Sequence, residues 1–395
     1  MRILVVHNTL NDSKSVSGGL RHFLLMANAW HKMGHSTDFL AAEAGRKTIT
    51  NFAPDAHFIS SDSFFDATKN LAQTWRYFPA YGYRLLTAHT VKLPHHYDVI
   101  LASTQLIVEV YPAMVLAKLQ RSKLAVKIHH VLATQRKHFT LNDRLFLWSE
   151  KVTARWINRH ADLVICGTKL VQNDFNQLTR KLGLPPKAST TIGYGVDLEP
   201  LLNMGKREKI YDAVYLGRLH EHKGVFELPG IWKKVTEQCP GAKLLVIGEG
   251  PHRSQMEKLF QQENLANSVT ITGAISEESK NDFLAQSRLG ITVSFEEGWG
   301  LSVNEFLAAG MPVVGYSLPI FDLVFPGRLL LKPSRDQTGV ADLIVQLLNS
   351  PERQSFLGQE GREFVKRYDF RQVAEEELGA LHSLLQRDST PSAIC

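Results

Sequence analysis

Two glutamates separated by seven residues stand in a glycine-containing segment of the C-terminal half. Glu297 and Glu305 lie within SFEEGWGLSVNEFLAAGMPVV, where an apolar strand pattern is followed by a helical pattern. Gly298 and Gly300 leave main-chain amides at the start of that helix open to a phosphate. Carboxylates accept hydrogen bonds from vicinal hydroxyls, so the segment predicts a site for an anion and a sugar ring. The structural alternative is a capping box of Ser302 and Glu305, in which the acid only satisfies the helix N-terminus.

Two cations stand in a loop that follows a predicted strand in the same half of the chain. Arg218 and Lys223 lie in YLGRLHEHKG, directly after the apolar residues of that strand. Loops at the carboxyl ends of parallel strands form the edge where open α/β sheets bind ligands. Two positive side chains there would stabilise a diphosphate as it leaves a sugar carbon. The alternative for each is an ordinary exposed cation. Pro229 predicts a kinked or delayed start for the helix that follows Lys223.

The N-terminal half carries weaker signals of the same kind. Gly18 and Gly19 end the loop after the first predicted strand, where they would admit a phosphate or a sugar close to the backbone. His129 and His130 end another strand, and an imidazole there could hydrogen-bond a sugar hydroxyl. Ordinary polarity of the sheet edge is an equal alternative for both histidines. The first loop lacks GxGxxG, which argues against a nicotinamide cofactor.

The chain shows no sequence signal for a metal. No DxD sequence occurs, and the three cysteines, Cys166, Cys239 and Cys395, lie far apart. Because two cations are available for a leaving group, we expect no metal and no cofactor other than the co-substrate. The cysteine spacing predicts neither a disulfide framework nor structural zinc. No apolar run approaches the roughly 20 residues that span a bilayer, so we expect a cytoplasmic protein.

Short apolar runs alternate with longer segments of helical period throughout the 395 residues. This alternation is typical of parallel sheets covered by helices, and the length favours two domains. We therefore predict two doubly wound α/β domains. The predicted strands are Arg2–His7, Ser36–Leu40, Asp98–Ala102, Leu124–His129 and Leu163–Cys166 in the first half, and Ala213–Leu216, Lys243–Ile247, Val269–Thr272, Leu289–Val293 and Pro312–Val314 in the second.

A polar stretch at 202–209, with four charged residues, is interpreted as the link between the two domains. The predicted domains are therefore 1–201 and 210–370. The segment Arg371–Leu385 has a strong amphipathic pattern and predicts a helix that ends the fold.

The formal charge of +6 is concentrated in the segment 118–159, which holds ten Lys or Arg and two acids. Within it, a predicted helix places Leu145, Trp148, Val152 and Trp156 on one apolar face and cations on the other. This basic segment suits an ordinary solvated face, a nucleic-acid surface, or contact with anionic lipid headgroups. We expect no nucleic-acid partner and keep peripheral contact with an anionic membrane, at its inner face, as a hypothesis.

Together these motifs resemble the large family of retaining GT-B glycosyltransferases numbered four, over almost the full length. The resemblance rests on EGWGLSVNEFLAAGMPVV, on GRLHEHKG, on VIGEGP at Val246–Pro251, on the paired glycines before a helix ending in MGH, and on GYGVD at Gly193–Asp197. It implies two Rossmann-like domains that face an interdomain cleft. It also implies that the last helix, within 371–388, crosses back to pack on the first domain.

The resemblance further implies a UDP- or GDP-sugar donor held mainly by the second domain. The acceptor would be a glycan or a lipid-linked molecule, in cell-surface glycan or glycolipid synthesis, and neither the base nor the sugar can be identified. The implied catalytic residues are Arg218, Lys223, Glu297 and His129. The implied donor contacts are Gly18, Gly19, Gly273, Ile275, Trp299, Gly300, Leu301 and Glu305, with Glu305 on the ribose and the main chain near Gly273 and Ile275 on the base.

Retention without an evident enzymic nucleophile favours attack by the acceptor from the face that the phosphate leaves. In this scheme the departing phosphate deprotonates the acceptor hydroxyl. Arg218 and Lys223 hold the charge that develops on the diphosphate. A GT-B phosphorylase or a nucleotide-sugar epimerase is the alternative among enzymes. A non-catalytic protein that binds a nucleotide sugar or a polyanion is the alternative from another class.

Overall fold

The computed structural model describes residues 1–8, 18–62, 77–131, 141–205 and 207–386. Within these ranges the chain alternates between strands and helices, and every strand pairing between named strands is parallel. The predicted α/β class is therefore confirmed. None of the helices in these ranges is long and apolar enough to cross a membrane.

Contacts divide the chain into two compact units, which are described separately. The first unit comprises Met1–Gly195 together with the C-terminal segment that begins at Phe370, and the second comprises Val196–Asp369. The predicted limits, 1–201 and 210–370, place the first boundary several residues later.

The short helix α8 (Glu199–Leu202) explains that difference. It packs against helices α11 and α12 of the second unit. The guanidinium of Arg362, also in the second unit, donates a hydrogen bond to the carbonyl of Leu202. The chain thus joins the second unit before the polar stretch that was interpreted as the link.

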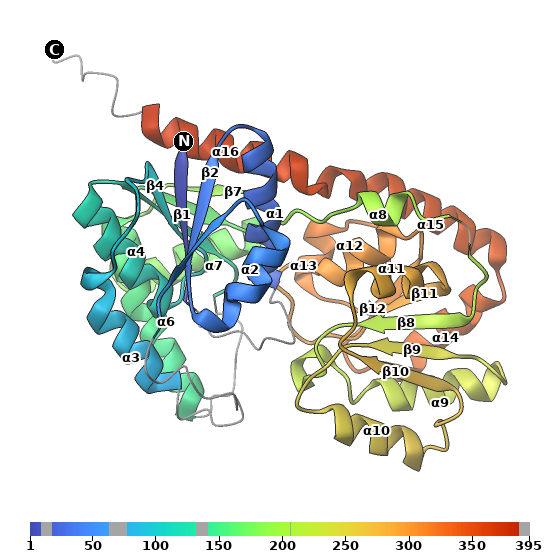
Figure 1. Cartoon of the computed structure of the whole chain (residues 1–395). Helices are drawn as coiled ribbons and strands as arrows, with labels where there is room; N and C mark the ends of the chain where they lie inside the picture. Colours follow the sequence, from blue (N-terminus) through green and yellow to red (C-terminus); the bar gives the residue numbers. More distant parts are fainter. Residues whose placement is uncertain (9–17, 63–76, 132–140, 206, 387–395) are drawn as a thin grey trace. The chain divides into compact units, whose positions relative to one another are not determined.

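The first unit is built on a seven-stranded sheet in the order β3-β2-β1-β4-β5-β6-β7 (Figure 1). Its strands are β1 (Arg2–His7), β2 (Ser36–Ala41), β3 (His57–Ser60), β4 (Val99–Ala102), β5 (Lys123–Ile128), β6 (Leu163–Cys166) and β7 (Ser189–Thr191). Its helices include α1 (Gly18–Lys32), α2 (Arg46–Phe52), α3 (Tyr77–Thr87), α4 (Ile107–Gln120), α6 (Leu141–His160), α7 (Lys169–Lys181) and α16 (Phe370–Gln386).

Both faces of this sheet are buried, as its apolar strands require. Successive side chains of a strand point to opposite faces. Ile3 and Val5 of β1 therefore pack in one cluster with residues of α1 and α16, whereas Leu4 and Val6 pack in another with residues of α4, α6 and α7. Parallel sheets need helices packed on both faces, because both faces carry apolar side chains.

The last helix, α16, belongs to the first unit although it follows the second unit in sequence. Val373, Ala374 and Leu381 lie in the same apolar cluster as α1. The indole Nε1 of Trp30 in α1 donates a hydrogen bond to the carbonyl of Ala374, 3.1 Å away. Figure 1 shows α16 running beside α1. These contacts give α16 an apolar face and two polar anchors, the second of which is described below.

The second unit is built on a six-stranded sheet in the order β10-β9-β8-β11-β12-β13. Its strands are β8 (Tyr211–Leu216), β9 (Leu244–Ile247), β10 (Val269–Gly273), β11 (Ser287–Thr292), β12 (Val313–Tyr316) and β13 (Leu329–Lys332). Its other helices are α9 (Leu228–Gln238), α10 (Arg253–Gln262), α11 (Glu277–Ala285), α12 (Leu301–Ala308), α13 (Pro319–Val324), α14 (Gln337–Leu348) and α15 (Pro351–Val365).

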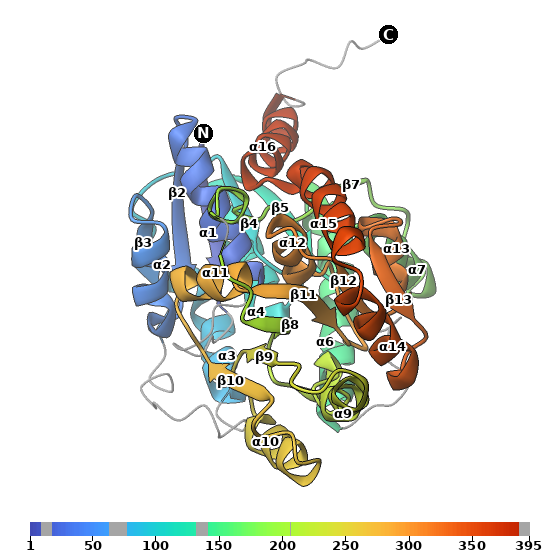
Figure 2. The ribbon, with the colours of Figure 1, turned by 90° about the vertical axis from the view of Figure 1, so that its right-hand side faces the viewer.

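Helices cover both faces of this sheet as well. On one face, Leu289 and Ile291 of β11 lie in a cluster with residues of α9, α10 and α14. On the other, Gly290 makes room for Phe306 of α12, since a Cβ at this glycine would lie 2.4 Å from the ring. Helix α12 packs in turn against α15 (Figure 2). Pro229 stands in the first turn of α9, so the predicted delayed start of that helix is confirmed.

Candidate active site

The candidate residues gather at the same topological position in each unit. In both sheets the strand order reverses between two adjacent strands, β1 and β4 in the first unit and β8 and β11 in the second. The carboxyl ends of parallel neighbours meet at one edge, and the reversal opens a crevice there in which α/β proteins bind ligands. The loops that carry Arg218, Lys223 and Glu297 follow two of these strands, β8 and β11, whereas His129 follows β5 and Gly273 ends β10.

In the second unit, the loop after β8 is folded back against the loop after β11. The hydroxyl of Tyr215 donates to the carbonyls of Arg218 and Lys223, each 3.4 Å away. Gly224 has a φ of +68°, and a Cβ there would lie 1.9 Å from the carbonyl oxygen of Val293. Glycine is therefore required at this crossing. The amide of Phe295 completes it by donating to the carbonyl of His222, 2.8 Å away.

This crossing brings two predicted site residues into contact. The Nζ of Lys223 lies 2.6 Å from Oε1 of Glu297. The hydroxyl of Ser294 donates to the same oxygen, at 2.8 Å. The side chains of Lys223 and Glu297 are 24% and 12% exposed. Arg218, at the start of the same loop, is exposed. Because the pair of Lys223 and Glu297 is partly exposed at the edge of the sheet, a charged ligand can bind to it.

Helix α12 begins at this edge with its main-chain amides uncapped by a side chain. Its N-cap is Gly300, with a φ of +100°, and no side chain bonds to the cap. The capping box of Ser302 and Glu305 is thus not formed, and Glu305 is the fifth helical residue and not part of the first turn. Trp299 is 8% exposed, with its ring edge-on to Tyr368 at 5.1 Å, so this tryptophan is held by its side chain inside the unit.

Glu305 is buried and paired with a lysine that the sequence did not point to. The Nζ of Lys280, in α11, lies 2.6 Å from Oε1 of Glu305 and 2.7 Å from Oε2 of Glu277. The side chains of Lys280 and Glu305 are 7% and 5% exposed. Lys280 therefore fixes the direction of the Glu305 carboxylate.

The predicted base contacts lie at the end of β10. The carbonyl of Gly273 accepts hydrogen bonds from the amide of Gly248 and from the hydroxyl of Thr272. These two bonds occupy both lone pairs of the oxygen. The part of Gly273 in base binding, like that of Ile275, stays a prediction, and it would have to use groups other than this carbonyl.

In the first unit, the structure brings the predicted glycines and histidine together. Gly18 and Gly19 are the first residues of α1. A Cβ at Gly19 would lie 3.3 Å from Cε1 and Nε2 of His129, so the glycine allows the imidazole to lie close to the start of the helix. His129 follows β5, which pairs with β4 beside the point where the strand order reverses.

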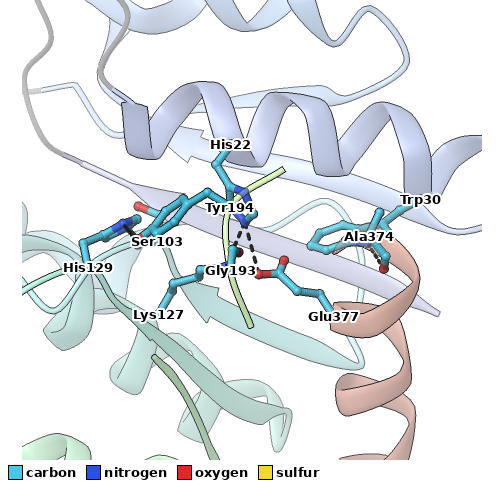
Figure 3. Close-up of polar contacts among 9 residues, drawn as sticks. All are labelled: His22, Trp30, Ser103, Lys127, His129, Gly193, Tyr194, Ala374 and Glu377. Atoms are coloured by element: carbon cyan, nitrogen blue, oxygen red, sulfur yellow. Dashed lines mark hydrogen bonds and ion pairs between the residues drawn. The ribbon is translucent and has the colours of Figure 1, made fainter. Parts of the chain in front are cut away.

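Both ring nitrogens of His129 are hydrogen-bonded (Figure 3). Nε2 lies 2.6 Å from the carbonyl oxygen of Ser103, and Nδ1 is bonded to the hydroxyl of Tyr194. The rings of His129 and Tyr194 are stacked, with centroids 5.3 Å apart. Burial, helped by the charge of Lys127, lowers the pKa of His129 to about 3, against the opposing effect of the bond to Ser103. His129 is therefore neutral at physiological pH.

Sequence reasoning missed several side chains that position the predicted ones. Lys280 and Tyr194 carried no motif signal of their own, although Tyr194 is the second residue of GYGVD. Ser103 not only faces His129 through its carbonyl but also bonds through its hydroxyl to Glu109, 3.0 Å away, and to His7, 2.7 Å away. These buried hydrogen bonds connect the carboxyl ends of β1 and β4, the two strands between which the order of the first sheet reverses.

Comparison with known proteins identifies the family. Residues 16–200 match the family described as Glycosyltransferase Family 4, and residues 203–364 match Glycosyl transferases group 1. The chain belongs to the family 4 glycosyltransferases. The division between the two matches falls close to the boundary between the two units.

The glycosyltransferase is similar to curated transferases over part of their length. It is 29% identical over 172 residues to an uncharacterized glycosyltransferase of Methanocaldococcus jannaschii, covering 40% of this chain and 41% of that one. Over 140 residues it is 28% identical to a 2-deoxystreptamine N-acetyl-D-glucosaminyltransferase of Niallia circulans, covering 35% and 36%. Over 292 residues it is 24% identical to a sulfoquinovosyl transferase of Arabidopsis thaliana, covering 69% and 54%. The matches span about half the length of these relatives or less.

Solved structures resemble the glycosyltransferase over nearly its whole length. The HepE protein of Anabaena, in complex with UDP and glucose, has a TM-score of 0.73 at 17% identity, covering 97% of this chain and 100% of that one. A sucrose-phosphate synthase from Thermosynechococcus elongatus has a TM-score of 0.77 at 18% identity, covering 98% and 99%. These similarities show the GT-B fold, as the sequence predicted.

The basic segment 118–159 of the glycosyltransferase is only partly a surface. Lys127, one of its ten cations, is fully buried and paired with Glu377, so it cannot meet a lipid or a nucleic acid. Residues 132–140 lie outside the described residues. In α6, Trp148 is 62% exposed, which corrects the prediction that it belongs to the buried apolar face of this helix. Trp156 does pack inward, with its ring centroid 5.4 Å from that of Tyr111.

Among the described residues of the glycosyltransferase, no three His, Cys, Asp or Glu side chains form a group that could hold a metal ion. The absence of a metal requirement stays a prediction, since a donor diphosphate can supply ligands of its own.

Proposed function

We propose that this glycosyltransferase transfers a sugar from a UDP- or GDP-sugar to an acceptor hydroxyl with retention of anomeric configuration. The contact between Lys223 and Glu297 carries the proposal. It joins a cation for the diphosphate and a carboxylate for the sugar at the carboxyl ends of adjacent strands. The family to which the chain belongs supports the retaining outcome, and the UDP bound in the similar HepE structure supports a nucleotide donor.

Each charged group has a separate part in this proposal. Arg218 and Lys223 neutralise the diphosphate as it departs. The amides at the start of α12, from Trp299, Gly300 and Leu301, meet a phosphate or the sugar. No side chain caps α12 at Gly300, and the N-terminus of a helix attracts an anion.

The two glutamates bind hydroxyls of the donor. Glu305, fixed by Lys280, accepts from the ribose diol, and Glu297 accepts from the donor sugar. The described contacts of Lys223 and Ser294 with Glu297 both fall on Oε1. The second oxygen of this carboxylate is then the acceptor for a sugar hydroxyl.

The proposed chemistry is attack from the face that the phosphate leaves. The departing phosphate oxygen takes the proton of the acceptor hydroxyl as the new glycosidic bond forms and the bond to phosphate breaks. Arg218 and Lys223 stabilise the charge that develops on the diphosphate, so the proposal needs no metal ion. The neutral His129 is not called on as a base in this scheme.

A panel of nucleoside diphosphates and their sugars, screened by thermal shift, tests the proposal. A bound donor raises the melting temperature by mass action, and the base that does so identifies the donor. Product analysis by NMR then follows, with and without candidate acceptors. Transfer with retention supports the proposal. Isomerised donor without acceptor would indicate an epimerase, and phosphorolysis would indicate a phosphorylase. Binding without turnover of any donor would favour a non-catalytic nucleotide-sugar binder.

The acceptor is proposed to be a glycan or a lipid-linked molecule, reached at an anionic membrane in cell-surface glycan or glycolipid synthesis. One face of α6 supports membrane contact: Trp148 is exposed beside Arg144, Lys151 and Arg155, which follow helical spacing and are exposed as well. Sedimentation with vesicles of phosphatidylglycerol and phosphatidylcholine tests this. We expect recovery with the anionic vesicles only, reduced in Trp148→Ser. Equal recovery with both vesicle types would contradict membrane contact through this face.

A further inference from the structure

A buried charged cluster lies directly behind His129 (Figure 3). Lys127 of β5, Glu377 of α16 and His22 of α1 are each at most 2% exposed. Lys127 forms an ion pair with Glu377, and its Nζ lies 3.0 Å from Nε2 of His22. That Nε2 also lies 3.1 Å from Oε1 of Glu377. Three elements far apart in sequence therefore meet at one buried polar cluster.

The cluster has one consistent charge state. Burial alone would raise the pKa of Glu377, but the charge of Lys127 and the hydrogen bonds to Lys127 and His22 lower it to about 2, so the carboxylate is ionised. Burial, followed by the charge of Lys127, lowers the pKa of His22, which is therefore neutral. Burial lowers the pKa of Lys127, and Glu377 opposes this effect. A charged lysine beside an ionised glutamate and a neutral histidine leaves no net charge in the interior.

The cluster fixes the segment that carries Tyr194. The Nζ of Lys127 donates to the carbonyl of Gly193, 3.2 Å away, and lies 5.0 Å from the centroid of the Tyr194 ring. His22 meets that ring edge-on, with centroids 5.2 Å apart. Gly167 makes room for the ring, since a Cβ there would lie 2.6 Å from it. Tyr194 is 4% exposed and has one orientation available.

Hydrogen-bonding rules then assign the proton of His129. The carbonyl oxygen of Ser103 can only accept, so Nε2 of His129 must carry a hydrogen. In the neutral ring Nδ1 must then be an acceptor. The hydroxyl of Tyr194 therefore donates to Nδ1, and burial raises the pKa of this tyrosine, which keeps its proton in place. The tyrosine and the carbonyl hold the two ends of the same ring.

We propose that Tyr194 is a positioning residue: the Ser103 carbonyl sets the tautomer of His129 with hydrogen on Nε2, and the Tyr194 hydroxyl, by donating to Nδ1, holds the ring so that His129 meets a substrate oxygen as a hydrogen-bond donor. That this substrate oxygen is a hydroxyl of the bound sugar rests on the proposed function. An incoming hydroxyl accepts from the same Nε2–H that the Ser103 carbonyl receives, while the bond from Tyr194 to Nδ1 persists. The residue is thereby prevented from acting as the base for the acceptor.

The assignment is tested without a substrate by NMR of the full-length protein labelled with ¹⁵N at histidine. His129→Gln identifies the two resonances of this ring. At pH 7 we expect a protonated Nε2 and an unprotonated, hydrogen-bonded Nδ1. In Tyr194→Phe the Nδ1 resonance should move to that of a nitrogen without a hydrogen bond. An imidazolium, hydrogen on Nδ1, or an Nδ1 resonance unchanged in Tyr194→Phe would overturn the proposal.

Two substitutions of His129 test the donor role once a donor sugar is known. The amide nitrogen of glutamine reaches about as far as Nε2, whereas that of asparagine reaches only as far as Nδ1. We expect His129→Gln to keep kcat/KM within about threefold and His129→Asn to lose about tenfold or more, the usual effect of one hydrogen bond. Equal losses in the two variants would overturn the donor role.

A double-mutant cycle separates positioning from general support of the fold. If Tyr194 acts through His129, Tyr194→Phe lowers kcat/KM about threefold to tenfold in the wild type but adds no loss to His129→Ala. Additive losses would show that the tyrosine acts by another route, and would overturn the proposal. Because the NMR result needs no turnover, a protein that transfers no sugar would refute the proposed function and still decide the tautomer.

Discussion

The Lys127–Glu377 pair behind the first sheet's site is buried, whereas the Lys223–Glu297 pair at the second sheet's site stays in partial contact with solvent. The side chains of Lys127 and Glu377 are at most 1% exposed, while those of Lys223 and Glu297 are 24% and 12% exposed. Removing one partner of a buried pair strands a desolvated charge, so such a pair holds one geometry. A partly exposed pair is weaker and can exchange partners. The first unit therefore supplies fixed orientation, and the second supplies charges that can turn to a ligand.

The strongest test of this difference is the removal of one buried charge. Lys127→Met should destabilise the first unit by about 3–5 kcal/mol, because Glu377 is left buried and unpaired. The double variant with Glu377→Leu should recover most of this loss, since it removes both charges. Hydrogen exchange of peptides from β5 and α16 in increasing urea measures the effect in this unit alone. A double variant as unstable as the single one would show that charge burial is not the cause.

The partly exposed cations should affect rate and not stability. Arg218→Ala or Lys223→Ala should lower kcat by about 10²-fold, or about 2.7 kcal/mol, as the loss of a preorganised donor to a departing oxyanion does. Lys233→Ala, which removes an exposed lysine of the same unit paired with Glu263, is the matched control and should keep wild-type kcat. Wild-type turnover of both site variants at saturating donor would refute the assignment.

The two units should also differ in their response to acid. The lowered pKa values of His129, about 3, and Glu377, about 2, belong to the first unit. The pKa of His129 in the folded protein lies below its ordinary value of about 6.5. Neutral His129 therefore contributes its full share of the free energy of unfolding above pH 6.5, and this share falls as the pH decreases towards 3. The loss should reach roughly 1–2 kcal/mol between pH 6.5 and 5. Below about pH 4.5 the protonation of Glu377 adds to it.

Hydrogen exchange at pH 7 and pH 5 measures this difference. Peptides of β5 should lose protection at pH 5, whereas those of β8 should change less. Equal loss in both sheets would mean that the acid response does not come from the His129 and Glu377 environments.

The smallest expected effect concerns Glu305. Glu305→Gln keeps a side-chain oxygen for Lys280 but loses the charge that strengthens a bond to the ribose diol, so affinity for the nucleoside diphosphate should fall about tenfold. Calorimetry should show the fall, while the drop in melting temperature without ligand should be limited, because Lys280 keeps its ion pair with Glu277. The 2′-deoxy nucleoside diphosphate should bind both forms about equally. A loss of stability with unchanged affinity would instead indicate that Glu305 only supports its helix.

Central strands could be predicted from the sequence because strands buried on both faces of a parallel sheet are continuous apolar runs. Arg2–His7 and Leu163–Cys166 have the predicted bounds, and the other eight predicted strands differ by a few residues. The missed strands, β3, β7 and β13, pair on one side only and are short. The sequences HFIS and STT of β3 and β7 have too few apolar residues to stand out from loops.

The sequence predicted candidate site residues but not the contacts between them. Lys223 and Glu297 meet because β8 pairs with β11, although two strands intervene in the sequence. Their pairing depends on where the strand order reverses, which local patterns do not reveal. Lys280 was missed for a related reason, because a lysine in an exposed helical pattern looks solvated until its neighbour α12 is in place.

The return of α16 to the first unit has a consequence for biosynthesis. The chain leaves that unit at Gly195 and re-enters it at Phe370, and these two residues are in contact, since a Cβ on the glycine would lie 2.5 Å from the Cα of Phe370. While the ribosome makes the intervening residues, the nascent Lys127 has no Glu377 with which to pair. The N-terminal sheet therefore cannot complete its folding until α16 has been synthesised, and a chain truncated before α16 would leave this buried lysine without its partner.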